Sequence, residues 1–159
     1  STFIGNDGVQ LCAERRGTGA RAALLLHGWI SSRRMWYDVA QHLDADRFTL
    51  HLLDFRGCGL SDRPDNGHDL ERYVSDARAA LASIDAPVIL AGHSMGGKVA
   101  QCLAAERPAN LEKLILVAPG TAQGGRGSER QRTVALDAYG SRVKIEAFQR
   151  ALAADFDCV

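Results

Sequence analysis

The tightest limit on how this chain folds comes from residues 88–97, which read VILAGHSMGG. An apolar segment of strand length runs directly into a helix-forming segment, and Ser94 lies at the junction between Gly92 and Gly96. This G-x-S-x-G spacing is typical of a strained strand–turn–helix that exposes a serine hydroxyl. Glycine fits on either side because side chains there would collide where strand and helix cross. The turn also places backbone N–H groups at a helix N-terminus, where negative charge is stabilised, so the run predicts an acyl-transfer or hydrolytic site.

The segments around this run predict an α/β architecture. Residues 22–26 and 114–118 are continuous apolar runs, typical of parallel strands buried on both faces, and residues 48–53 predict a third strand. Between the strands, segments with helical spacing predict helices at 31–43, 69–84 and 94–106. Strands that alternate with helices favour a mostly parallel sheet with helices on both faces and a site at the carboxyl ends of the strands. Residues 9–14 alternate apolar and polar residues, which predicts an edge strand in a hairpin.

Two further segments follow predicted strands and are expected at the same end of the sheet. His27 and Gly28 end the strand at 22–26, and Asp54 ends the strand at 48–53. An oxyanion hole needs two N–H donors aimed at one point, one of them from the residue after the nucleophile. Met95 N–H and Trp29 N–H are the natural pair. The alternative reading, a glycine-rich turn for packing or phosphate binding, is weakened because neither G-x-x-x-x-G-K-[ST] nor G-x-G-x-x-G occurs.

Three motifs together resemble the α/β-hydrolase superfamily over residues 3–118: HGW at 27–29, DFRGCGLS at 54–61 and GHSMGG at 92–97. The resemblance is to its serine esterase, enol-lactonase, haloperoxidase-like and carbon–carbon-bond hydrolase members. It implies Ser94 as the nucleophile and Trp29 and Met95 as oxyanion donors. It also implies that segment 54–61 is a structural turn, so that Asp54 is not catalytic. The residues that would shape the elbow and substrate pocket are His27, Gly28, Gly92, His93 and Gly96.

The base and acid of a serine triad have no counterpart in the sequence. In this family the order along the chain is serine, acid, histidine, yet no histidine follows Ser94. His93 is adjacent to Ser94, but neighbouring side chains on a sharp turn diverge. We therefore expect an α/β-hydrolase fold that is truncated before its last strands. The favoured explanation is a second polypeptide segment, separated by cleavage in the lid, that carries the catalytic histidine and acid. A truncated chain and a natural pseudo-hydrolase are the alternatives.

Composition excludes several other classes of protein. Lys and Arg together number 19, as do Asp and Glu, so the zero formal net charge favours neither nucleic acid nor an anionic membrane as a partner. The four cysteines show neither metal-ligand nor disulfide-framework spacing, which favours a reducing cytoplasm. The first residues lack a basic segment before an apolar run, so we expect no signal peptide. No metal and no organic cofactor are implied.

The sequence thus predicts a serine hydrolase that cleaves a small carboxylic ester, thioester, lactone or amide through an acyl-enzyme. An acyltransferase using the same site, or a small-molecule binder without turnover, stays open. Residues 1–120 are expected to form the N-terminal part of the hydrolase core. The glycine-rich segment after Gly120 introduces residues 121–159, which we expect to begin a lid.

Overall fold

The computed structural model describes residues 2–121 and 143–144. The chain divides into two units, residues 1–123 and 124–159, and the description below concerns the first. The predicted lid at 121–159 lies outside the described residues apart from positions 121 and 143–144. Its role as a lid therefore stays a prediction.

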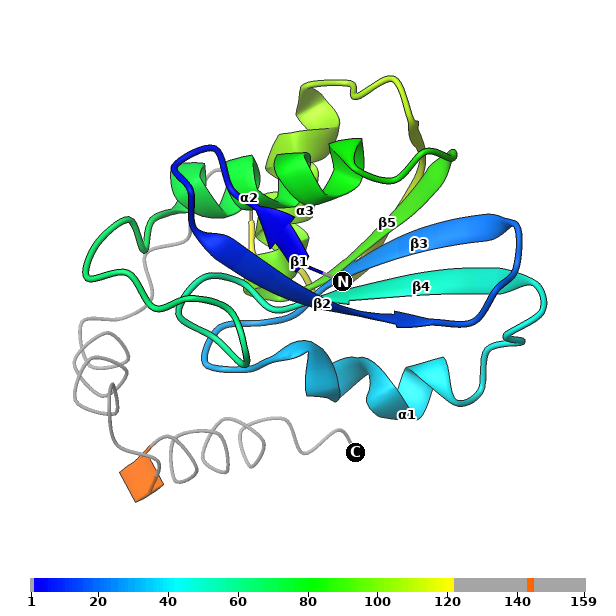
Figure 1. The fold of residues 1–159 in the computed structure, drawn as a ribbon, viewed down its shortest axis with the longest axis horizontal. Coiled ribbons are helices and arrows are strands. Elements are labelled where there is room, and N and C mark those ends of the chain that lie inside the picture. Colours follow the sequence, from blue (N-terminus) through cyan, green and yellow to red (C-terminus); the bar gives the residue numbers. More distant parts are fainter. Residues whose placement is uncertain (1, 122–142, 145–159) are drawn as a thin grey trace. The chain divides into compact units, whose positions relative to one another are not determined.

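A six-stranded sheet forms the centre of the first unit, in the order β1-β2-β4-β3-β5-β6 (Figure 1). The pairs β4–β3, β3–β5 and β5–β6 are parallel, whereas β1–β2 and β2–β4 are antiparallel. The mostly parallel sheet of the predicted α/β-hydrolase fold is therefore confirmed. The strands are β1 (Thr2–Ile4), β2 (Gln10–Arg16), β3 (Arg21–Leu26), β4 (Phe48–Leu53), β5 (Val88–His93) and β6 (Leu111–Val117).

Helices cover both faces of this sheet (Figure 1). On one face lie the 3₁₀ helix η1 (Arg33–Trp36) and α1 (Tyr37–Ala40), which bury Trp36 and Ala40 against β3, β4 and β5. On the other face lie α2 (Leu70–Ala82) and α3 (Met95–Ala105). Asp69 caps α2 by accepting a hydrogen bond from Arg72 N–H at 2.9 Å, as the sequence predicts. The larger of the two hydrophobic clusters lies under α2 and α3 and includes Leu24, Leu26, Leu90, Val99 and Leu103.

Three expectations about individual elements are corrected. The single helix predicted at 31–43 is a 3₁₀ turn followed by a short α-helix, and the 3₁₀ turn lies where Arg33 is anchored to Asp54. The predicted hairpin forms between β1 and the strand at Gln10–Arg16, but this strand is not the outermost one, because β1 pairs with its residues 10–12. The strand predicted as buried at 114–118 is β6, in which residues 114–117 are 38–48% exposed because β6 is the last strand of the described sheet.

Candidate active site

The carboxyl ends of β3, β4 and β5 meet at one edge of the sheet. Leu26, the last residue of β3, is in register with Leu53 of β4 on one side and with Gly92 of β5 on the other. The loops that follow these strands begin at His27, at Asp54 and at Ser94. The structure therefore brings together the three motif-bearing segments that the sequence places at this end of the sheet.

Ser94 occupies a strained turn between β5 and α3. Its φ of 51° and ψ of −114° lie in a region that a non-glycine residue rarely adopts, and its side chain makes no capping bond to α3. A Cβ at Gly92 would lie 2.4 Å from the carbonyl oxygen of Gly96, and one at Gly96 would lie 2.4 Å from that of Leu26. Both glycines are therefore required by backbone contacts, because no movement of a side chain could relieve them.

The backbone of this turn is held on both sides. Ser94 N–H donates to Val117 O at 3.1 Å, and Ser94 O accepts from Gly120 N–H at 2.8 Å. The Gln101 side chain on α3 in turn donates to Gly120 O at 2.8 Å. The end of β6 therefore helps to maintain the strained conformation of the serine.

The loop after β3 lies directly against this turn. Gly28 is buried, and a Cβ built on it would lie 3.4 Å from Ser94 Cβ and 2.9 Å from His93 Nδ1. The next residue, Trp29, has a side chain that is 41% exposed. Met95 is the first residue of α3, so its N–H has no partner within the helix. The two predicted oxyanion donors thus come from the two segments that flank Ser94.

Neither nearby histidine is placed as a base. His27 is fully buried, its Nδ1 lies 2.7 Å from Gly28 O, and its Nε2 accepts from Phe55 N–H at 3.1 Å. Both ring nitrogens are therefore occupied, and burial lowers the pKa of His27. His93 precedes Ser94 and has a pKa lowered by burial, and its Nδ1 is buried with no hydrogen-bond partner among the described residues.

Asp54 is buried and joins two loops. Its carboxylate accepts from Arg33 N–H at 2.7 Å and from Leu60 N–H at 3.0 Å, and it also pairs with the Arg33 guanidinium. The Arg33 side chain continues to Glu14 on β2 at 3.2 Å. These contacts match the structural role expected of Asp54. Arg33 was missed by sequence reasoning, because nothing in the local pattern distinguishes it from Arg34 beside it.

Arg56 forms a second buried charge cluster. Its guanidinium donates to both carboxylate oxygens of Asp76 at 2.6 Å and reaches Asp7 at 2.8 Å. The hydrogen bond to Asp76 is the main cause that holds the pKa of Arg56 above its usual range. This cluster fixes the loop after β4 to α2 and to the turn that follows β1. The same loop carries Asp54, which binds the loop after β3.

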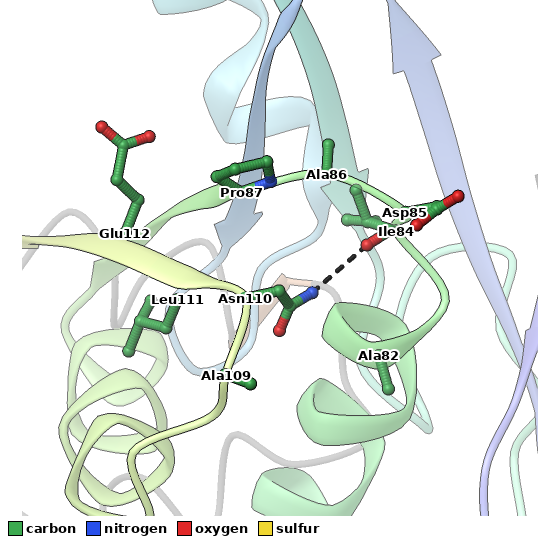
Figure 2. A pocket seen from close by; sticks show the side chains of 9 residues that line it. All are labelled: Ala82, Ile84, Asp85, Ala86, Pro87, Ala109, Asn110, Leu111 and Glu112. Carbon is green, nitrogen blue, oxygen red and sulfur yellow. Dashed lines mark hydrogen bonds between the residues drawn. The ribbon is translucent and has the colours of Figure 1, made fainter.

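One hollow on the described surface lies away from the serine. Figure 2 shows that it lies between the end of α2 and the amino ends of β5 and β6, with Pro87, Asn110 and Glu112 among its lining residues. The Asn110 amide donates to Ile84 O at 3.2 Å across it. Ser94 follows the opposite end of β5, roughly 20 Å away for a six-residue strand. The hollow is therefore separate from the predicted acyl site.

Residues 2–121 and 143–144 contain neither a metal-binding cluster nor a membrane-spanning helix. Within these residues no group of three or more His, Cys, Asp or Glu side chains could hold a metal ion. No helix in the same part of the chain is long and apolar enough to cross a membrane.

Comparisons with known proteins agree with this geometry. A family model described as alpha/beta hydrolase fold matches residues 23–155. The chain is 36% identical over 111 residues to the AB hydrolase superfamily protein YisY of Bacillus subtilis (strain 168), covering 69% of this chain and 41% of that protein. It is 33% identical over 105 residues to a pimeloyl-[acyl-carrier protein] methyl ester esterase of Pectobacterium carotovorum, covering 66% of this chain and 39% of that protein.

Among solved structures, an esterase from Exiguobacterium antarcticum superposes with a TM-score of 0.79 at 24% identity. The superposition covers 91% of this chain and 57% of that chain, and at this identity it shows a shared fold only. The chain therefore spans about two fifths of the two curated relatives and just over half of this structure.

Proposed function

Because the chain belongs to the α/β-hydrolase fold family, we propose that it bears the nucleophile of a serine hydrolase. The observation that carries the proposal is the conformation of Ser94, which is held at φ 51° between β5 and α3 with its side chain making no capping bond. A strained residue persists only where the surrounding structure enforces it, and such residues cluster at active sites. The proposed substrate is a small carboxylic ester, thioester, lactone or amide.

In the proposed reaction, Ser94 Oγ attacks the substrate carbonyl carbon while a general base takes the hydroxyl proton. The carbonyl oxygen becomes an oxyanion and accepts hydrogen bonds from Met95 N–H and Trp29 N–H. Collapse of this intermediate breaks the bond to the alcohol, thiol or amine, which takes up the proton held by the base, and leaves an acyl-enzyme. Water then attacks the acyl carbon, and its proton passes through the base to Ser94 Oγ as the acid is released. The methyl ester esterase of Pectobacterium carotovorum, a relative at 33% identity, supports an ester as the first substrate class to test.

We propose that the base and its acid come from a further polypeptide segment. No histidine follows Ser94 in the sequence, and His27 has both ring nitrogens occupied. The exposed apolar residues of β6 support the same proposal, because an unpaired apolar strand is a surface that proteins usually cover. The segment is either the remainder of a longer chain or a separate product of cleavage.

Mass spectrometry of the purified, denatured protein tests this part of the proposal. A longer chain, or a second species that carries a histidine, supports it. A single species of the 159-residue sequence that still hydrolyses esters would overturn it, since the base would then lie within this chain.

A fluorophosphonate probe tests the nucleophile in the complete protein, since such probes react with activated serines. We expect labelling that is lost in Ser94→Ala and kept in Ser83→Ala, which removes a hydroxyl near the end of α2. Labelling that survives in Ser94→Ala would assign the nucleophile elsewhere. Absence of labelling in the unaltered protein would instead favour the small-molecule binder without turnover.

The proposal includes a cytoplasmic location. Its support is Cys12, Cys58 and Cys102, which are free cysteines in a chain without disulfide spacing. Burial raises the pKa of the Cys58 thiol to about 11, so this residue is poorly suited to redox chemistry at neutral pH.

A further inference from the structure

The peptide group between Ser94 and Met95 contains one of the two N–H groups that we propose as oxyanion donors. Its carbonyl oxygen, Ser94 O, accepts hydrogen bonds from Lys98 N–H at 3.0 Å and from Gly120 N–H at 2.8 Å. A carbonyl oxygen has two lone pairs, so its accepting capacity is filled. In a planar trans peptide the C=O and the N–H point in opposite directions, so the partners of Ser94 O also determine where Met95 N–H points.

The two partners of Ser94 O attach it to different parts of the structure. Lys98 lies in the first turn of α3, so its bond belongs to the helix that Ser94 caps. Gly120 belongs to the turn that follows β6, and Ser94 N–H donates to Val117 O at the end of the same strand, at 3.1 Å. The bond from Gly120 therefore fixes the orientation of the Ser94–Met95 peptide relative to the sheet.

The turn formed by residues 118–120 is strained and lies close to α3. Ala118 has a φ of 39°, in the left-handed region that residues other than glycine rarely adopt. The next residue, Pro119, is so near the helix that a Cβ built on Gly97 would lie 2.8 Å from Pro119 Cβ. Because a strained conformation persists only where neighbouring groups enforce it, this turn needs a contact from outside itself.

Gln101 supplies such a contact from α3, about two helical turns after Ser94. Its side-chain amide nitrogen donates to Gly120 O at 2.8 Å and to Gly97 O at 3.1 Å. Both partners are carbonyl oxygens, which only accept, so the NH₂ end of the amide with its two hydrogens faces them. Gly120 is therefore bound on both sides, with its N–H on Ser94 and its C=O on Gln101.

We infer that Gln101 is a positioning residue for the acyl site. By binding Gly120 O it keeps Gly120 N–H on Ser94 O, and this bond keeps Met95 N–H aimed at the oxyanion. The inference rests on the proposed function, since it assigns a role within that reaction. The effect passes through backbone groups, so it requires no contact between Gln101 and the substrate.

Asn110 provides a matched control at the other end of β6. Like Gln101, it has a partly buried side-chain amide that donates to two backbone carbonyl oxygens, here Leu81 O at 2.9 Å and Ile84 O at 3.2 Å. Figure 2 shows the bond to Ile84, which lies at the amino end of β6 and away from the serine. Loss of this amide removes the same kind of contact without reaching the acyl site.

Two pairs of substitutions use this match. Gln101→Glu and Asn110→Asp keep the size of each side chain but replace its NH₂ group with a carboxylate oxygen, which cannot donate. Gln101→Met and Asn110→Leu fill a similar space without a donor, and they take over where a carboxylate variant does not fold. A purely structural role predicts that activity follows thermal stability at both positions, whereas a positioning role predicts a loss of activity at position 101 only.

The first experiment measures kcat, KM and melting temperature for the complete protein and these variants, with p-nitrophenyl acetate as the substrate. We expect kcat for Gln101→Glu to fall by about 10-fold or more with little change in KM, because a misaligned donor stabilises the oxyanion less than an aligned one. For Asn110→Asp we expect an unchanged kcat at a comparable loss of melting temperature.

Two ketones, measured as inhibitors, separate oxyanion stabilisation from binding in general. A pentyl trifluoromethyl ketone forms an oxyanion with an activated serine, whereas pentyl methyl ketone has nearly the same shape and resists that addition. The affinity of Gln101→Glu for the trifluoromethyl ketone should fall in parallel with kcat/KM, and its affinity for the methyl ketone should stay the same.

An unchanged kcat in Gln101→Glu or Gln101→Met would overturn the inference, and so would equal losses of kcat at positions 101 and 110. Unchanged affinity for the trifluoromethyl ketone, or an equal loss for both ketones, would overturn it as well. Failure of the proposed function looks different, because the unaltered protein would then lack Ser94-dependent hydrolysis altogether.

Discussion

Gly59 faces the Asp54 carboxylate at a distance that leaves no room for a side chain. A Cβ at this position would lie 2.0 Å from Asp54 Oδ2, and the residue has a φ of +53°. We expect Gly59→Ala to lower the free energy of unfolding by about 2–4 kcal/mol, because it adds backbone strain and displaces a buried, hydrogen-bonded carboxylate. Urea denaturation of the complete protein measures this loss.

Gly8 supplies the matched control for this substitution. Its φ is +84°, yet a Cβ there would meet no heavy atom within 4 Å. Gly8→Ala should therefore cost only the strain of the left-handed conformation, roughly 1–2 kcal/mol. If the two substitutions cost the same, Asp54 can move aside and does not fix the loops that flank the serine.

The sequence predicts those features of single residues that depend on local geometry. The strained turn at Ser94 is predictable because the strand, the helix and the two glycines that shape it are all within a few residues. The contact between the His27 ring and Gly28 O could not be predicted from the sequence. The orientation of the ring depends on Phe55 N–H, 28 positions from His27 in the chain. Arg33 is equally hidden, since its partner Asp54 is brought to it only by the pairing of β3 with β4.

At the scale of elements, the positions of the parallel strands can be predicted from the sequence, whereas the exposure of the outer strand cannot. β3 and β5 read as strands from their own residues, and Asp69 marks the start of α2 by capping chemistry that needs no tertiary contact. The exposure of β6 could not be predicted, since an apolar strand reads the same at the centre of a sheet as at its edge.

The exposed side chains of β6 permit a test of whether this strand is covered in the complete protein. Ile115 is 48% exposed here, and Val39 on α1 is 46% exposed. If a further segment covers β6, Ile115→Asp should lower the free energy of unfolding by about 3 kcal/mol or more, because it buries an unpaired carboxylate. Val39→Asp should cost less than about 1 kcal/mol, as surface substitutions usually do.

Urea denaturation of both variants in the complete protein makes this comparison. A small and equal cost at the two positions would show that β6 stays exposed. The exposed apolar residues of β6 would then no longer support the proposal that a further segment covers this strand and carries the base.

At the scale of the whole described unit, Arg56 joins parts that are distant along the chain. It links the turn after β1 through Asp7, the loop after β4 on which it lies, and α2 through Asp76. Asp76 is fully buried, whereas the Asp7 side chain is 29% exposed. The outer end of this cluster is therefore the part that responds to the pH of the solvent.

The Arg56 hydrogen bond lowers the pKa of Asp7 from its ordinary 3.8 to about 2. As the pH falls, the unfolded chain therefore takes up this proton before the folded chain does, and unfolding becomes more favourable. The stabilisation by Asp7 is complete above about pH 4 and is lost as the pH falls through about 2. At the partly exposed site it is on the order of 1 kcal/mol.

Substitution of Asp7 by Asn tests this linkage. At about pH 5 we expect the free energy of unfolding of Asp7→Asn to lie below that of the unaltered protein by on the order of 1 kcal/mol, and the gap should close toward pH 2. Urea denaturation across this range measures the gap, with Asp65→Asn, an exposed loop carboxylate, as the control whose gap should stay small throughout. A gap for Asp7→Asn that does not change with pH would show that the Asp7 carboxylate contributes through shape rather than through its charge. Asp76 would then be the carboxylate whose charge holds Arg56.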